Sequence, residues 1–143
     1  MSDSGDGAVG HAPRVSVLMT CHNAAATIEE SVRSVIAQTY GDWELVLVDD
    51  LSTDDSLARV ERLGDPRIHI VRLPTRHRRT RALNAGLRVA RGEYVAVLDA
   101  DDLAAPERLA RQVAALDARP DLAGGGSWFV DIDAARSEEH TSE

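Results

Sequence analysis

The sequence predicts an α/β domain with a Rossmann-like, mostly parallel sheet flanked by helices. Short apolar runs alternate along the chain with segments of helical periodicity, which is typical of repeated right-handed βαβ units. Three of the four apolar runs are almost continuously apolar, as expected for strands covered on both faces. The length of 143 residues, with 43% hydrophobic and 28% charged residues, suits one soluble globular domain.

The predicted strands are the short apolar runs themselves. They are Val15–Met19, Leu45–Val48, Ile68–Val71 and Tyr94–Leu98. A fifth strand is expected to begin near Ser127, in the stretch "GGGSWFVDIDA". Because each run is only a few residues long and is followed by turn-forming residues, a strand fits better than a buried helix.

Helices are predicted between the strands. Thr27 and Glu30 fit a capping box at the start of the first helix, and residues 52–55 open the second. The third helix is expected to stop at Gly92, and Pro106 suits the first turn of the fourth. The apolar residues at helical spacing are Ile28, Val32, Val35 and Ile36, then Leu57 and Val60, then Leu83, Leu87 and Ala90, then Leu109, Val113 and Leu116.

Composition and charge exclude several classes of function. The net charge of −8 argues against nucleic acid as the main partner, since phosphate binding needs a basic face. Cys21 is the single cysteine, which excludes an internal disulfide and a multi-cysteine metal site. There is no apolar stretch of membrane-spanning length, and residues 1–13 read as a flexible tail without the plan of a signal peptide. We therefore expect a cytoplasmic location, with membrane association left open for a longer protein.

Polar clusters follow three of the predicted strands. They are Thr20-Cys21-His22-Asn23, Asp49-Asp50-Leu51-Ser52-Thr53-Asp54 and Asp99-Ala100-Asp101-Asp102. In open α/β sheets, ligands bind beyond the carboxyl ends of the strands, and parallel strands bring these ends to one edge. We therefore expect the three clusters to meet in one site.

The third cluster, Asp99, Asp101 and Asp102, is the strongest candidate for a metal site. Residues two apart on an extended chain point the same way, so Asp99 and Asp101 can both face one ion. Carboxylate oxygens are the ligands that hard cations such as Mg²⁺ prefer. The alternative is an acidic turn at the start of a helix, where aspartates are common, and for Asp102 a role as a helix cap alone stays open.

These motifs together resemble the family 2 glycosyltransferases, inverting enzymes of the GT-A fold that use nucleotide-sugar donors. The stretches that carry the resemblance are "VSVLMTCHN", "SVRSVIAQTYGDWELVLVDDLSTDDS", "ALNAGLRVARGEYVAVLDADD" and "PERLARQ", spanning about residues 15–122 in the family's order. The resemblance implies Mg²⁺ or Mn²⁺ as cofactor and a nucleotide-diphospho-sugar, most simply a UDP-sugar, as donor. The acceptor, a sugar or a lipid-linked glycan, is not specified by these motifs.

The resemblance also assigns roles to individual residues. Asp101 is expected to contact the metal, and Asp99 to hold the ribose or a metal-bound water. Asp50 corresponds to the carboxylate that accepts a hydrogen bond from the uracil imide N–H. Thr20 and His22 lie where the family packs the base. Asp54 and Asp55 are instead assigned to the favourable charge at a helix start.

Two loops depart from the family's pattern. Leu51 stands where relatives usually have glycine. The basic run "RHRRTR", residues 76–81, also lacks the glycine that relatives often carry. This run is either a solvated loop or a clamp for the donor diphosphate, with Arg81 as the best candidate. Asn84 and Gly86 match the family's next helix, where close packing explains them as well as ligand contact does.

The final residues, "RSEEHTSE", resemble the translation of a sequencing-library adapter. We therefore expect a truncated GT-A domain over residues 14–135 and an artefactual tail without a fold over residues 136–143. The family's general base and its Gln-Arg-Trp-type motif would then lie beyond the chain, so that no catalytic base is assigned and the fragment is expected to be inactive.

The predicted function is transfer of a sugar from a nucleotide-diphospho-sugar to an acceptor hydroxyl with inversion. Two alternatives stay open: a non-catalytic nucleotide-sugar-binding module, and a nucleotidyltransferase. The second usually has a glycine-rich, basic loop after its first strand, which "TCHNAAAT" lacks. A receiver-type signalling domain also gathers aspartates at strand ends, but it needs a lysine, and this chain has none.

Overall fold

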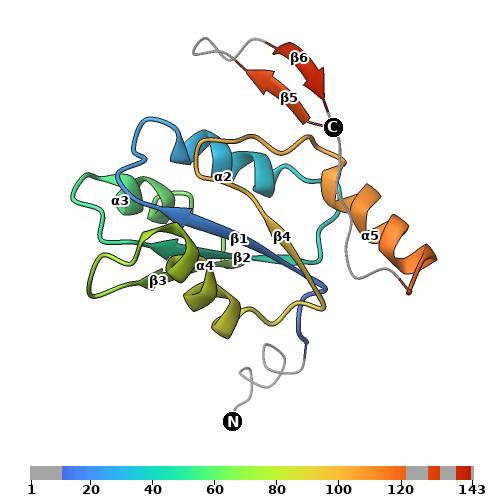
Figure 1. Cartoon of the computed structure of the whole chain (residues 1–143), viewed down its shortest axis with the longest axis horizontal. Helices are drawn as coiled ribbons and strands as arrows, with labels where there is room; N and C mark the ends of the chain where they lie inside the picture. The colour runs from blue at the N-terminus through green and yellow to red at the C-terminus, as the bar shows by residue number, and fades with distance from the viewer. Residues whose placement is uncertain (1–10, 122–128, 133–137, 143) are drawn as a thin grey trace.

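Four parallel strands form the central sheet of this protein, in the order β3-β2-β1-β4 (Figure 1). The structure is a computed structural model that describes residues 11–121, 129–132 and 138–142. The strands are β1 (Val15–Cys21), β2 (Trp43–Asp49), β3 (Ile68–Arg72) and β4 (Tyr94–Val97). Every pairing in this sheet is parallel, and each strand coincides with a predicted one to within two residues at either end. The predicted α/β class is therefore confirmed.

Helices cover both faces of the sheet. On one face, α2 (Ile28–Ile36), α3 (Ser56–Glu61) and α5 (Arg108–Ala118) pack against alternate residues of the strands. On the other face, α4 (Arg78–Val89) packs against Leu18, Val46 and Val48. This arrangement explains why β2, the strand between β3 and β1, is buried at all seven positions. A strand with helices on both faces has no side that needs polar residues.

Two of the predicted helix end signals are wrong. Thr27 precedes α2 but makes no capping hydrogen bond, because its hydroxyl group donates to the carbonyl oxygen of Ala100 instead. Gly92 does not end α4, whose last residue is Val89. A Cβ atom at Gly92 would lie 2.5 Å from the backbone nitrogen of Ser16, so this glycine serves the close approach of two chain segments.

A second, two-stranded sheet is formed by β5 (Phe129–Ile132) and β6 (Glu138–Ser142), which pair antiparallel. The start of β5 agrees with the expected fifth strand. Strand β6 lies inside residues 136–143, for which we expected no fold. The difference has a simple physical reason, since strand pairing satisfies backbone groups whatever the side chains are. The artefactual origin of this segment stays a prediction.

The described part of the chain contains no helix with the length and apolar character needed to cross a membrane.

Candidate functional site

The loops that follow β1, β2, β3 and β4 meet at the carboxyl edge of the sheet, as the parallel topology requires. The predicted site residues Thr20, His22, Asp50, Asp99 and Asp101 all belong to the ends of strands or to the loops at this edge. The sequence clusters that follow the first, second and last of these strands are therefore brought to one side of the molecule.

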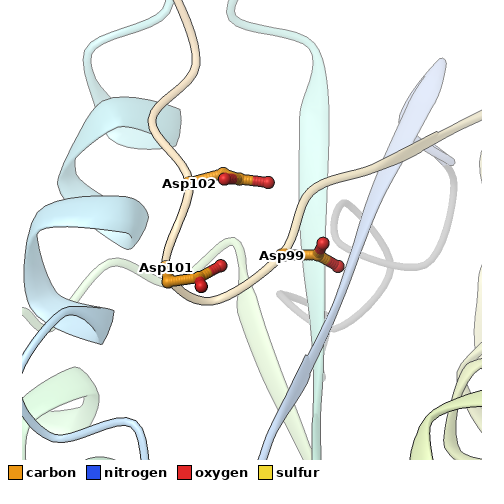
Figure 2. Close-up of side chains that lie close together, drawn as sticks. All are labelled: Asp99, Asp101 and Asp102. Carbon is orange, nitrogen blue, oxygen red and sulfur yellow. The ribbon is translucent and has the colours of Figure 1, made fainter. Parts of the chain in front are cut away.

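The acidic turn, Asp99 to Asp102, directly follows β4. Figure 2 shows the three carboxyl groups on one bend of the chain, all turned to the same side. One ligand atom from each of Asp99, Asp101 and Asp102 lies within 4.8 Å of the others. The bend is closed by a hydrogen bond of 3.0 Å from the Asp102 amide to the Asp99 carbonyl oxygen. This donor set has the oxygen chemistry that Mg²⁺ or Mn²⁺ requires.

Helix α2 supports the acidic turn. The hydroxyl groups of Thr27 and Ser31 donate to the carbonyl oxygen of Ala100, at 3.0 and 2.8 Å. Ser31 is fully buried, and Ala100 is 8% exposed. The backbone between Asp99 and Asp101 is therefore fixed by two hydrogen bonds from a helix that packs in the core.

Asp50, at the end of β2, is buried and is surrounded by donors. The backbone amides of His77 and Arg78 each donate to its carboxylate at 2.6 Å, and the Arg76 guanidinium pairs with the same group. Burial disfavours the charged form, but the two amide hydrogen bonds and the Arg76 charge outweigh it and lower the pKa of Asp50. Asp50 is thus a charged carboxylate held by the loop after β3 and by the first residue of α4.

Arg79, in the first turn of α4, connects this part of the chain to the acidic turn. Its guanidinium lies 2.8 Å from an oxygen of Asp99, and both side chains are about half exposed. We call residues 76–79 the arginine strap, since they contact Asp50 after β2 and Asp99 after β4. The prediction singled out Arg81 in this run, but Arg76 and Arg79 make the contacts with the predicted site carboxylates. Arg81 lies exposed on α4.

The loops after β1 and β2 are joined to each other. A ring nitrogen of His22 lies 2.8 Å from the carbonyl oxygen of Asp50. The side-chain oxygen of Asn23 accepts hydrogen bonds from the amides of Thr53, at 2.7 Å, and Asp54, at 3.3 Å. These contacts set the spacing of the two loops between which the prediction places the base.

Among the residues that the structure describes, three non-glycine residues have positive φ, and all three lie at this edge, two in loops and one at the first position of α4. They are Asn23 (52°), Leu51 (62°) and Arg78 (66°), one after each of β1, β2 and β3. For Leu51 this conformation favours glycine, the residue that the family resemblance leads us to expect at this position. Arg78 has this conformation at the first position of α4, directly after the loop that follows β3. Such backbone strain concentrates at functional sites.

Residues farther along the chain have mainly packing roles. A Cβ atom at Gly86 would lie 2.2 Å from a side-chain carbon of Leu18, which supports close packing of α4 on the sheet. Arg108 is held beside β4 by a hydrogen bond of 3.0 Å to the Val97 carbonyl oxygen. Burial lowers the pKa of Arg108, and the nearby charge of Asp102 partly offsets this.

A hollow of about 570 Å³ lies at the opposite, amino-terminal edge of the sheet. Its lining includes Trp43, Glu44, His69 and Arg91 and none of the predicted site residues. The carboxyl edge nevertheless carries the convergent carboxylates and guanidinium groups, and chemistry locates a charged ligand better than volume does.

Three sets of contacts in this site were not predicted from the sequence. They are the hydrogen bonds from Thr27 and Ser31 to Ala100, those that Asn23 accepts from the loop after β2, and the ion pairs of Arg76 and Arg79. For the first set, the sequence shows only two hydroxyl residues at a helix start. The Arg76 and Arg79 contacts could have been suspected from the basic run, because the polar clusters at the same edge contain six aspartates that need counter-charges.

Comparison with known proteins agrees with this architecture. The family described as Glycosyl transferase family 2 matches residues 16–142. EpsE of Bacillus subtilis is 41% identical over 108 residues, which cover 73% of this chain and 39% of EpsE. The chain thus spans about two fifths of that relative.

Solved structures of the GT-A fold also resemble the chain. TarS residues 1–349 of S. aureus, in complex with UDP-GlcNAc, match with a TM-score of 0.72 at 30% identity, over 75% of this chain and 32% of that one. The mannosyltransferase PcManGT of Pyrobaculum calidifontis, in complex with GDP-Man and Mn²⁺, matches with a TM-score of 0.67 at 37% identity, over 74% of this chain and 33% of that one.

Proposed function

The chain belongs to glycosyl transferase family 2, and we propose that it binds a nucleotide-diphospho-sugar donor together with a divalent cation at the carboxyl edge of its sheet. The convergence of opposite charges carries this proposal. The acidic turn offers oxygen ligands for a cation, and the arginine strap beside it offers guanidinium groups for phosphate oxygens.

The cation fits the acidic turn by chemistry. We propose Asp101 as a direct ligand and Asp99 as a ligand or as the partner of a metal-bound water or the ribose. Mg²⁺ and Mn²⁺ both suit such a set, and Mn²⁺ is present in the PcManGT complex. When bound, the ion would neutralise negative charge on the donor diphosphate.

For the nucleotide, Asp50 is proposed to accept the uracil imide N–H, with Thr20 and His22 beside the base. UDP is supported by the TarS complex with UDP-GlcNAc, whereas the PcManGT complex holds GDP-Man. Arg81 remains a proposed contact of the diphosphate, next to the strap arginines Arg76 and Arg79.

For the whole enzyme, we propose a single displacement with inversion, in which the acceptor oxygen forms a bond to the anomeric carbon while the bond from that carbon to the diphosphate breaks and the nucleoside diphosphate leaves. The acceptor hydroxyl would lose its proton to a carboxylate that is not assigned among the described residues. The role of the described residues is then to bind and orient the donor. The acceptor would be a sugar or a lipid-linked glycan.

The experiment is isothermal titration calorimetry of the 143-residue chain with UDP, GDP and ADP, each with Mn²⁺, with Mg²⁺ and with a chelator. We expect UDP to bind with the cation and to lose most of its affinity in the chelator, with ADP as the weak control. Equal binding of all three nucleotides, independent of the cation, would contradict the proposal. Preference for GDP would correct the assignment of the base only.

A further inference from the structure

We propose that the arginine strap is a latch that closes the donor site in the nucleotide-free protein and must release Asp50 before a nucleotide can bind. The inference rests on the proposed function for the identity of the ligand. The latch itself rests on contacts of this chain alone.

The first observation is that Asp50 is inaccessible. Its side chain is 3% exposed, and both carboxylate oxygens are engaged. One oxygen accepts the His77 amide, and the other accepts the Arg78 amide and the Arg76 guanidinium. A carboxylate has acceptor capacity beyond three bonds, but a planar base cannot reach one that is covered in this way. The strap therefore has to move if Asp50 is to contact a nucleotide.

The second observation is the path of the strap. Asp50 follows β2 and Asp99 follows β4, and β1 lies between these two strands in the sheet. The strap contacts both carboxylates, through Arg76 and Arg79, and so it reaches across the end of β1, where Thr20 and His22 lie. The ion pair between Arg79 and Asp99 joins two half-exposed groups and is weak. The contacts with the buried Asp50 therefore contribute most to keeping the strap in place.

The third observation is that the closed strap is strained at its centre. Arg78 has a φ of 66°, a conformation that disfavours every residue with a side chain at Cβ. With His77 right-handed and Arg78 left-handed, the amides of both residues point at one carboxylate, in the manner of an anion-binding nest. Strain at the anchor lowers the cost of release, as a latch requires.

Release by a donor would be an exchange of partners. The guanidinium groups of Arg76 and Arg79 would leave Asp50 and Asp99 and pair with the diphosphate oxygens. Asp50 would become free for the base, and Asp99 for the ribose or the cation. Because only the open fraction binds, the apparent nucleotide affinity is reduced by that fraction, and loosening the latch should increase it.

Limited digestion with trypsin tests the latch without any ligand, since Arg76, Arg78 and Arg79 are cleavage sites within the strap. In Asp50→Asn we expect strap cleavage to be about tenfold faster than in the wild type, because cleavage follows the open population. Arg76→Gln should likewise speed cleavage after Arg78 and Arg79, which keeps the test valid if Asp50→Asn fails to fold. Arg88→Gln, in the last turn of α4, is the matched control and should leave strap cleavage unchanged.

Stopped-flow binding of UDP with Mn²⁺ tests whether opening of the strap limits nucleotide binding. Arg76→Gln should increase the association rate about threefold or more, because its strap is open more often, and Arg88→Gln should not. Unchanged strap cleavage in both Asp50→Asn and Arg76→Gln would overturn the latch even if UDP binds. A lower affinity of Arg76→Gln with an unchanged association rate would make Arg76 a plain phosphate ligand. If the wild type does not bind UDP, the donor proposal is wrong, and so is the proposal that the strap controls nucleotide binding. The digestion would still test whether the contacts with Asp50 keep the strap closed.

Discussion

The Ser31 hydroxyl donates a hydrogen bond of 2.8 Å to the carbonyl oxygen of Ala100, the residue between the two proposed metal ligands Asp99 and Asp101. The hydroxyl of Thr27 donates to the same oxygen at 3.0 Å. Because α2 is anchored in the core by residues such as Ile28, the acidic turn is built on a rigid support. The geometry of the proposed metal site therefore depends on side chains that do not contact the metal.

Replacing Ser31 by alanine should weaken the proposed metal site. The substitution removes one of two hydrogen bonds to the Ala100 carbonyl, and we expect a loss of stability of about 1 kcal/mol. The affinity for Mn²⁺, measured by calorimetry, should fall about tenfold or more, as is usual for supporting residues. Ser34→Ala is the matched control, since its hydroxyl bonds to the Ser31 carbonyl and the Ala104 amide, outside the turn. Equal losses of Mn²⁺ affinity in both variants would argue against a specific support.

Removing the Asp101 carboxylate should abolish cation-dependent UDP binding. Asp101 is exposed, so Asp101→Ala should change the stability by no more than about 0.5 kcal/mol, and the circular dichroism spectrum should be unchanged. Glu107→Ala removes an exposed carboxylate near the start of α5 and is the control. If Asp101→Ala kept the wild-type affinity for UDP in the presence of Mn²⁺, Asp101 would not be a metal ligand.

Glycine at position 51 should relieve backbone strain. Leu51 has a φ of 62° and is 44% exposed, so its side chain contributes little burial. The left-handed conformation costs a non-glycine residue roughly 1–2 kcal/mol, and glycine loses about 0.5–1 kcal/mol through its greater freedom in the unfolded chain. We therefore expect Leu51→Gly to be more stable than Leu51→Ala in urea denaturation. The reverse order would show that the loop does not store strain at this residue.

The strands and the site edge could be predicted because their signals are local. The run Leu45–Val48 is uniformly apolar, and the acidic turn follows its strand directly in the sequence. Parallel topology then places the polar clusters together without further information. What could be predicted was which loops form the site.

The contacts within the site could not be predicted, because they join side chains that are far apart in the sequence. The hydroxyl of Thr27 fits a helix cap equally well, and only the folded chain shows that it donates to Ala100. The same holds for Arg76, whose charge is compatible with solvent, with a phosphate or with Asp50. A glycine such as Gly92 also has two interpretations, a helix end and a close approach, and the packing against Ser16 decides between them.

A buried carboxylate far from the site contributes to the acid sensitivity of the fold. Glu44 lies in β2 and is 2% exposed. Its carboxylate accepts hydrogen bonds from the Ser16 hydroxyl at 2.6 Å, the Arg91 amide at 2.8 Å and the Arg91 guanidinium at 3.1 Å. Burial alone would raise the pKa of Glu44, but these hydrogen bonds and the Arg91 charge prevail and lower it from its ordinary value of 4.5.

The stability that Glu44 contributes should therefore be lost in acid. A carboxyl group with a lowered pKa in the folded state contributes fully above its unfolded value of 4.5, and the contribution disappears as the pH falls below 4.5 and through the folded pKa.

Glu44→Gln should lower the free energy of unfolding by about 1–3 kcal/mol at pH 7, since an amide cannot accept all three bonds. Urea denaturation between pH 7 and pH 3 should show a shallower decline for this variant than for the wild type. Some decline should persist, because Asp50 also has a lowered pKa. Glu107→Gln, an exposed control, should keep the wild-type slope. A slope in Glu44→Gln that is parallel to the wild-type slope would mean that the pKa of Glu44 is not lowered by folding.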